Sequence, residues 1–202
     1  MPYKEHLSKD KRFKKLIEKH EGFTLKKRKN LCIYLCASIM SQQLSTKVAD
    51  VIYQRFLNLY DGKEPTAEQI LETPLPTLRS IGLSNAKTNY VHNVARFSLE
   101  QGMDHKKLNK MENEEVIAYL TQIKGVGRWT VEMLLMFALG REDVFSIDDL
   151  GIQNAMIGIY KLERADKKKF KADLLRISEK WSPYRTYACI HLWHWKDNSP
   201  AK

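Results

Sequence analysis

The sequence predicts an all-α fold, and three observations lead to this expectation. Apolar residues recur three or four positions apart, the spacing of a buried helix face, in segment after segment of the 202-residue chain. No stretch of useful length alternates apolar and polar residues as a half-buried strand does, and no fixed period marks a repeat protein. With 43% hydrophobic and 29% charged residues, the composition is that of a globular protein able to bury a core.

The first half of the chain is expected to form helices separated by polar breaks. Residues 4–20 have the pattern of a basic amphipathic helix, and a strong helix follows from Asn30. The polar segment SQQLS, residues 41–45, interrupts this pattern before the next helix, around 48–59. Three more helices are expected: a short one opened by a capping box at Thr66, one from Thr73 to Gly82, and a long one from Asn85 to Gln101 capped by Ser84.

The second half is organised around residues 120–153, LTQIKGVGRWTVEMLLMFALGREDVFSIDDLGIQ. An apolar stripe ends at Ile123, the two glycines of KGVG permit a tight reversal with positive φ, and a second helical pattern begins at Trp129. Asp148 and Asp149 then stand at the start of another helix. Around this segment we expect a polar connection at 103–113 with Asn113 as N-cap, helices at 150–161 and 166–180, and a final helix with Pro183 in its first turn.

The charge balance indicates an acidic partner. Lys and Arg number 34 against 24 Asp and Glu, which gives a net charge of +10 and a pI near 9.4. Such a surface attracts polyanions, duplex DNA foremost, although general solubility is the alternative explanation. Three cysteines are too few for a four-cysteine zinc site or iron–sulfur cluster, so neither cofactor is expected.

Nothing in the sequence indicates a membrane or secretory segment. No run approaches about eighteen apolar residues, and residues 1–15 lack the core of a signal peptide. We therefore expect a cytoplasmic, nucleoid-associated protein, or a nuclear one in a cell with a nucleus.

The glycine hairpin has the backbone groups of an anion-binding site. Its backbone amides, together with those at the start of the following helix, form a small concavity suited to a phosphate. Arg128 and Thr130 can add side-chain donors, and Asp149 supplies an acid a short distance along the chain. A backbone-binding hairpin near an acid suggests an enzyme that acts on nucleic acid. The alternative is an ordinary corner between two helices with an N-capping aspartate.

The segments GVGRWT and VFSIDDLGIQ resemble the signature of the helix-hairpin-helix (HhH-GPD) DNA glycosylase superfamily, and within it the 3-methyladenine DNA glycosylase II branch. ASIMSQQLSTKVA, IGLSNAKTNYVHNVA and WSPYRTYACIHLWHW agree as well, so the resemblance spans about residues 30–195. It implies a compact, two-lobed all-α fold with a cleft between the lobes. Residues 1–202 would form one glycosylase unit, with one lobe at about 30–110 and a hairpin and catalytic lobe at about 111–195, the N-terminal helix packing nearby.

The resemblance also implies which residues act. Asp149 matches the catalytic aspartate, which stabilises positive charge on the deoxyribose, while Asp148 is expected to brace the turn or cap the helix. Gln43 matches the residue that fills the gap left by a flipped nucleotide; a plain polar turn is the alternative. The other implied residues are base-contacting Trp129, Trp193 and Met133, and DNA-binding Gln42, Lys87, Lys124, Gly125, Val126, Gly127, Arg128 and Thr130.

The reaction implied by the resemblance is hydrolysis of the N-glycosidic bond of alkylated purines, such as 3-methyladenine and 7-methylguanine, in base excision repair. Members with lyase activity carry a lysine where this chain has Trp129, so a monofunctional enzyme that leaves an abasic site is expected. Met133 occupies a position that is aromatic in some relatives, which leaves the range of bases open.

The expected partner is duplex DNA containing alkylated bases, bound by a monomer without a membrane. The resemblance implies no required cofactor, although a Na⁺ or K⁺ ion is expected at the hairpin, on backbone carbonyls of Thr121, Ile123 and Val126. Two alternatives stay open: a non-catalytic hairpin module that binds DNA phosphates, and a bifunctional glycosylase/lyase for oxidised bases.

Overall fold

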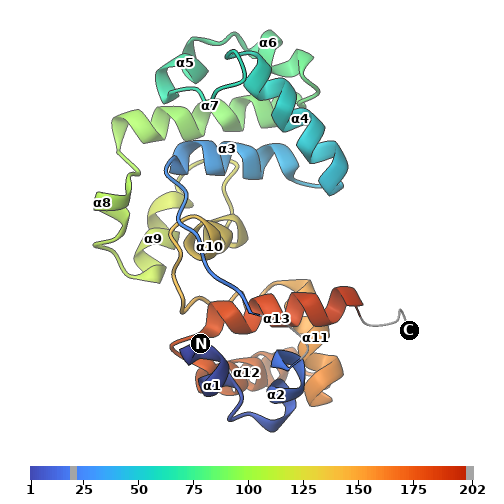
Figure 1. Ribbon diagram of the computed structural model, residues 1–202. Helices are drawn as coiled ribbons and strands as arrows, with labels where there is room; N and C mark the ends of the chain where they lie inside the picture. Colours follow the sequence, from blue (N-terminus) through green and yellow to red (C-terminus); the bar gives the residue numbers. More distant parts are fainter. Residues whose placement is uncertain (19–21, 199–202) are drawn as a thin grey trace. The chain divides into compact units, whose positions relative to one another are not determined.

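The computed structural model describes residues 1–18 and 22–198, and within these ranges all regular secondary structure is helical (Figure 1). The all-α expectation is therefore confirmed. Backbone contacts divide the chain into unit 1, Met1–Lys26 with Leu135–Lys202, and unit 2, Lys27–Leu134. The boundary falls inside helix α10, Arg128–Phe137. None of the described helices combines the length and apolar character that crossing a membrane requires.

Unit 2 is built on two long helices, α3 and α7. α3 (Leu31–Ser41) packs against α7 (Asn85–Glu100) and α4 (Thr46–Asn58), and α5 (Ala67–Glu72) also packs against α7, as Figure 1 shows. The remaining helices of unit 2 are α6 (Leu75–Ser80), α8 (His105–Leu108), α9 (Asn113–Leu120) and the first part of α10. The residues buried along α3 include Leu35, Cys36 and Ile39, all fully buried, which is why its apolar pattern is strong in the sequence.

Local sequence signals place most helix starts in unit 2. The side chains of Asn30 and Ser84 accept hydrogen bonds from backbone N–H groups three residues on, and Thr66 and Gln69 form the expected capping box. The expectation for Asn113 is wrong, because Asn113 is the first residue of α9. A carboxylate oxygen of Glu115 instead accepts a hydrogen bond at 2.6 Å from the backbone N–H of Glu112, the N-cap. The expected polar connection before it contains the short helix α8.

Unit 1 surrounds a cluster of aromatic side chains. Its helices are α1 (Pro2–Leu7), α2 (Lys11–Ile17), the end of α10, α11 (Leu150–Tyr160), α12 (Lys167–Ser178), the 3-10 turn η1 (Glu179–Trp181) and α13 (Arg185–Asn198). α11 packs against α13. Trp181 is fully buried, and the ring centroids of Phe13 and Phe145 lie 5.0 and 6.0 Å from its own. This cluster fixes the N-terminal segment to the C-terminal half of the chain.

Two sequence expectations in unit 1 are corrected. The single helix expected at 4–20 is divided into α1 and α2. The first ends at Leu7 with Ser8 as its C-cap, and Asp10 then caps the second, accepting a hydrogen bond from Arg12 N at 2.9 Å. The last two residues of the expected helix, 19 and 20, lie outside the described residues. Pro183 lies before α13, which begins at Arg185, and therefore does not occupy the first turn of that helix.

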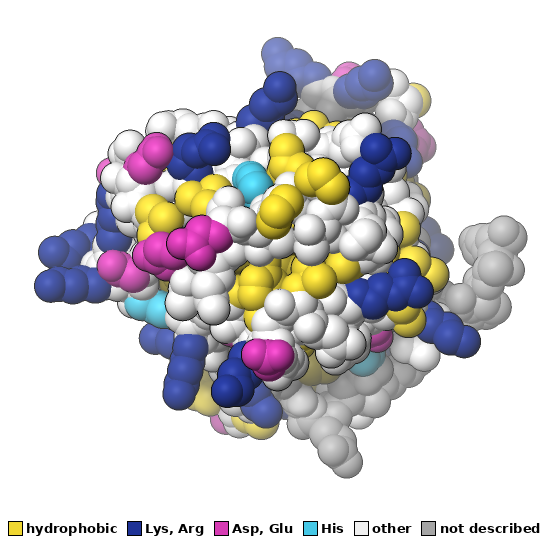
Figure 2. All heavy atoms as spheres, turned by 90° about the horizontal axis from the view of Figure 1, so that it is seen from above, with side chains coloured by type: hydrophobic (Ala, Val, Ile, Leu, Met, Phe, Trp, Pro, Cys, Tyr) yellow, Lys and Arg dark blue, Asp and Glu magenta, His cyan; other side chains and the backbone are white. Residues whose placement is uncertain are grey.

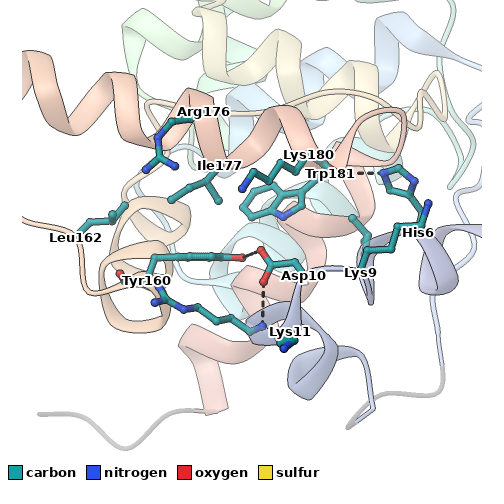
Figure 3. Close-up of a pocket in the computed structure, with 12 residues that line it drawn as sticks. His6, Lys9, Asp10, Lys11, Tyr160, Leu162, Arg176, Ile177, Lys180 and Trp181 are labelled. Carbon is teal, nitrogen blue, oxygen red and sulfur yellow. Dashed lines mark hydrogen bonds between the residues drawn. The ribbon is translucent and has the colours of Figure 1, made fainter.

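The N-terminal segment also borders a cavity of about 640 Å³ in unit 1 (Figure 3). In that view the Tyr160 hydroxyl donates a hydrogen bond of 2.7 Å to the carboxylate of Asp10, beside the buried Trp181. Burial and then this bond raise the pKa of Tyr160. The Arg12 guanidinium donates to the Tyr160 carbonyl at 3.0 Å. These contacts join α2 to the end of α11. The polar groups that line the cavity therefore hold helices of unit 1 together.

Candidate active site and nucleic-acid interface

The hairpin between α9 and α10 has the predicted tight reversal, but only one of its glycines needs a special conformation. Val126 N donates to Ile123 O at 3.0 Å, which closes the turn. Gly125 has φ of 104°, and a Cβ at this position would lie 2.2 Å from Cγ of Tyr90. Gly127 has no such φ, and a Cβ there would meet no atom within 4 Å. The protein itself thus requires Gly125, whereas Gly127 leaves open space on the outside of the turn.

Side-chain hydrogen bonds tie the hairpin to the long helices of unit 2. Asn93 of α7 donates to Lys124 O at 3.2 Å, and Gln42 at the end of α3 donates to Gly125 O at 3.4 Å. Backbone contacts likewise group the hairpin with residues 27–134, and its expected place in a lobe at about 111–195 stays a prediction. The hydrogen bonds from Asn93 and Gln42 therefore hold the backbone of the turn against α7 and the end of α3.

Two side chains expected to contact phosphate have other surroundings. Arg128 forms ion pairs with Glu114, at 2.9 Å between Nη1 and Oε2, and with Glu132, at 3.0 Å. The bond to Glu114 is the main reason that the pKa of Arg128 is raised. Thr130 is buried, as is Val126. In the free protein the Arg128 side chain is thus paired with carboxylates and Thr130 is buried, and their contacts with phosphate stay a prediction. The turn also offers backbone N–H groups, since the first amides of a helix lack intrahelical acceptors.

The polar elbow between α3 and α4 presents Gln43 on the surface. Gln43 is exposed and has φ of 59°, a left-handed conformation that costs a non-glycine residue about 1–2 kcal/mol. Leu44 N donates to Ser41 O at 3.1 Å across the elbow. The ammonium group of Lys87 donates to the carbonyls of Met40 and Gln42 at 2.9 and 2.6 Å. Lys87 therefore binds the protein backbone in the free protein, and its expected contact with a DNA phosphate stays a prediction.

Of the implied base-contacting residues in unit 2, one is exposed and one is buried. Trp129, in the first turn of α10, keeps 50% of its surface accessible, which is unusual for a large aromatic side chain. Met133, one turn further on, is 8% exposed, and its carbonyl accepts a hydrogen bond from the Tyr34 hydroxyl at 3.1 Å. Burial raises the pKa of Tyr34 to about 12, so this hydroxyl stays a donor at neutral pH. Trp129 is thus the better placed of the two to meet a base.

Asp149 in unit 1 lies at the N-terminus of α11, and one of its carboxylate oxygens accepts two hydrogen bonds. Its Oδ1 accepts a hydrogen bond from Ile152 N at 2.8 Å and another from the indole N–H of Trp193 at 3.0 Å. Asp149 is therefore the cap of α11. The capping role expected for Asp148 is wrong, because its exposed carboxylate lies 3.4 Å from Lys171 Nζ. The carboxylate of Asp149 is thus held in a defined orientation at the end of the helix where negative charge is favoured.

The bond from Trp193 to Asp149 was not foreseen from the sequence. Trp193 is half-buried, and its ring centroid lies 6.0 Å from that of Phe137. A Cβ on Gly151 would come within 3.1 Å of Asp149 Oδ1 and 3.2 Å of Trp193, so a glycine leaves room for this contact. No sequence signal joins a tryptophan and an aspartate 44 positions apart, although the pairing of DDLG with HLWHW in the family signature is a pointer.

Neither a metal site nor the cavity of unit 1 described above coincides with these residues. Among residues 1–18 and 22–198, no group of three or more His, Cys, Asp or Glu side chains is arranged to hold a metal ion. The cavity of Figure 3 is lined by none of the residues that the sequence assigned to catalysis or DNA binding. The candidate residues are therefore described unit by unit: unit 2 contains the exposed hairpin and elbow, and unit 1 contains the capped aspartate Asp149.

An all-helical fold with a helix-hairpin-helix turn, followed by an aspartate at the next helix N-terminus, defines the helix-hairpin-helix class of DNA repair enzymes. Residues 36–180 match the model of the HhH-GPD superfamily base excision DNA repair proteins. The chain belongs to this family.

Similar proteins agree with the assignment. The chain is 36% identical over 185 residues to DNA-3-methyladenine glycosylase 1 of Schizosaccharomyces pombe, covering 91% of this chain and 80% of that protein. The structure of a 3-methyladenine DNA glycosylase of S. pombe in complex with abasic DNA superposes with a TM-score of 0.85 at 32% identity, covering 100% of both chains. A DNA-3-methyladenine glycosidase of Bacillus halodurans gives a TM-score of 0.83 at 36% identity, covering 96% of this chain and 88% of that one.

Proposed function

We propose that the protein is a monofunctional DNA glycosylase of base excision repair that flips alkylated purines out of duplex DNA and hydrolyses their N-glycosidic bond, leaving an abasic site. The observation that carries this proposal is the carboxylate of Asp149, held at a helix N-terminus by Ile152 N and Trp193 Nε1. The relatives named above, which act on 3-methyladenine by name, support the choice of substrate.

The proposed chemistry assigns Asp149 to charge stabilisation. Cleavage of the bond between base and sugar develops positive charge on the deoxyribose, and a fixed carboxylate beside the sugar stabilises that state and orients the attacking water. Trp193 holds the carboxylate oxygen through its indole N–H, so it orients the charge in addition to the base contact that the resemblance implied. A cationic alkylated base leaves readily, so the step needs no general acid.

In this proposal, unit 2 binds the DNA backbone and contacts the flipped base. The backbone N–H groups of Gly125, Gly127 and the start of α10 bind one phosphate, with Lys124 exposed next to them. Trp129, half exposed, stacks on the flipped base, and a cationic purine on an indole gains a cation–π term. Gln43 fills the gap left in the duplex. No lysine stands at position 129, so a Schiff base does not form there and the enzyme does not cleave the strand.

A monovalent cation at the hairpin belongs to the same proposal. The carbonyls of Thr121, Ile123 and Val126 are its expected ligands, and Ile123 O keeps a second lone pair after accepting from Val126 N. A Na⁺ or K⁺ ion bound there adds positive charge next to the phosphate. We further propose that the protein acts as a monomer, without another cofactor, in the compartment that holds DNA, cytoplasm or nucleus.

The test is a base-release assay on methylated duplex DNA. We expect free 3-methyladenine or 7-methylguanine, an abasic product strand that breaks only after alkali or heat, and no covalent adduct on treatment with borohydride. DNA binding without release of any base would support the non-catalytic hairpin module. A trapped adduct with release of oxidised bases would support the bifunctional glycosylase/lyase.

A further inference from the structure

Lys87 occupies an unusual position for a lysine. It lies in the first turn of α7, where its backbone N–H donates to the Ser84 cap at 3.3 Å. A cation at a helix N-terminus faces the positive end of the helix dipole, which is unfavourable. Partial burial adds to the cost and lowers the pKa of Lys87. A compensating interaction is therefore needed to keep an ammonium group in this place.

The compensation comes from the end of another helix. The Lys87 ammonium donates to Met40 O at 2.9 Å and to Gln42 O at 2.6 Å, carbonyls that α3 leaves without intrahelical partners. A cation is favoured at the C-terminus of a helix, so the negative end of the α3 dipole stabilises the positive charge of Lys87. Charge-assisted bonds of this length are among the stronger ones in proteins.

Gln43 follows directly on this contact. The carbonyl of Gln42, which Lys87 binds, belongs to the peptide group that enters Gln43 with its left-handed φ of 59°. Gln42 in turn donates from its side chain to Gly125 O of the hairpin at 3.4 Å. The elbow is thus held from two directions, by Lys87 through its backbone and by the hairpin through a side chain.

We propose that Lys87 is a positioning residue that fixes the elbow around Gln43 before DNA binds, so that the plug enters the duplex preformed. The proposal rests on the function proposed above for Gln43. A plug ordered in advance loses less conformational freedom at the moment of insertion, so the flipped state of a paired lesion forms more readily. Lys87 does not touch the base in this role and acts through Gln43.

The first experiment needs no DNA. Amide hydrogen exchange of Leu44, whose N–H is bonded to Ser41 O, reports the order of the elbow in the free protein. Lys87→Met removes both donated bonds, and we expect exchange about tenfold faster. Lys63→Met removes an exposed lysine of the same unit, for which the described residues show no ion pair, and should leave the exchange unchanged. Equal protection in Lys87→Met and wild type would overturn the proposal.

The second experiment compares one lesion in two duplexes under single turnover. Opposite a paired base, we expect Lys87→Met to release the lesion about tenfold more slowly, and opposite an abasic position at nearly the wild-type rate. Lys87→Arg, which keeps a cation able to donate to both carbonyls, should recover most of the loss. Equal slowing on both duplexes indicates a general structural defect and overturns the positioning role.

A double-mutant cycle separates action through Gln43 from a phosphate contact. If Lys87 acts through the plug, Gln43→Ala with Lys87→Met is no slower on the paired lesion than Gln43→Ala alone. If Lys87 binds phosphate, the two losses add, and Lys87→Met weakens binding to every duplex with a shallower salt dependence. A wild type that releases no base overturns the proposed function alone, because the exchange measurement still decides whether Lys87 orders the elbow.

Discussion

Unit 1 and unit 2 carry their charge differently. Unit 1 contains twenty of the 34 Lys and Arg residues and thirteen of the 24 Asp and Glu, whereas unit 2, which contains the hairpin, has fourteen and eleven. In the view of Figure 2, which looks onto the elements at the top of Figure 1, apolar side chains gather towards the middle of the visible face. The hairpin is therefore not located in the more basic unit.

Net charge and specific binding to the DNA backbone are therefore separate properties of the chain. Within unit 2, the Arg128 guanidinium is paired with Glu114 and Glu132, and the Lys87 ammonium with two carbonyls. The turn around Gly125 and Gly127 instead presents backbone amides. These are directional hydrogen-bond donors without a formal charge. Long-range attraction to DNA comes from the charge of the whole chain, while the register on the backbone comes from amides.

The largest expected effect is in unit 1, at Asp149. Asp149→Asn removes the charge but keeps an oxygen that can cap α11 and accept from Trp193, so the fold should persist. We expect base release to fall about 10²–10³-fold while DNA affinity is kept or increased. Single-turnover release and equilibrium binding on the same duplex measure both quantities.

Asp148→Asn is the matched control for this change. Its carboxylate is exposed and pairs only with Lys171 at 3.4 Å among the described contacts, an interaction worth about 0–1 kcal/mol. Base release by this variant should stay close to wild type. An Asp149→Asn enzyme within tenfold of wild type would remove the catalytic role from unit 1 altogether.

The next effect concerns the exposed aromatic of unit 2. Trp129→Ala should slow release of cationic methylpurines about 10- to 100-fold, because stacking of a base on an aromatic ring contributes about 1–3 kcal/mol. Neutral bases should suffer less, and Trp129→Phe should recover part of the rate. Since half of the Trp129 surface is exposed, the melting temperature should change little. An equal loss for charged and neutral bases would contradict the cation–π contribution.

The two glycines of the hairpin form a matched pair of smaller effect. Gly127→Ala adds a methyl group that meets no protein atom within 4 Å, so stability should be kept while binding to every duplex weakens by about tenfold or less. Gly125→Ala must relieve a contact of 2.2 Å with Tyr90 and a φ of 104°, so it should lower the melting temperature as well. Thermal unfolding and duplex binding, measured together, distinguish the two. A destabilised Gly127→Ala protein would show that this glycine, too, serves the fold.

The smallest effect tests a charge of unit 1 that serves stability. Burial by itself raises the pKa of Asp143, but hydrogen bonds from Arg185, at 2.6 and 2.8 Å, and from Ser182 outweigh it and lower the pKa. A lowered pKa in the folded state means stabilisation that is present above about pH 4 and is lost as the pH falls further. Asp143→Asn should therefore cost about 1–3 kcal/mol at pH 7 and less at pH 3, as measured by urea unfolding.

Asp173→Asn is the control for that measurement, because its pairing with Arg176 involves a more exposed partner. Its unfolding free energy should change by under about 1 kcal/mol at either pH. If Asp143→Asn shows the same loss at pH 3 as at pH 7, the stabilisation does not depend on the ionised carboxylate.

Much of the molecule was determined by the sequence alone. The helical class, the caps at Thr66 and Ser84, the glycine turn and the aspartate at the start of α11 all follow from residues within a few positions of one another. Such features depend on backbone conformation and on hydrogen bonds across three or four residues, and these are set locally. Apolar spacing and the family signature therefore suffice for the fold class and for the position of the candidate aspartate.

The partners of the long polar side chains depend on how distant helices pack, which local sequence does not show. Lys87 reaches carbonyls 45 and 47 positions away, Arg128 turns to Glu114, and Trp193 donates to Asp149 across 44 positions. A long polar side chain has several possible partners of similar energy, and the packing of distant helices determines which one lies within 3 Å. Thr130 became buried for the same reason, since the face of α10 that is covered depends on its neighbours. Sequence fixes where a donor stands on its helix, and the packed core decides what that donor meets.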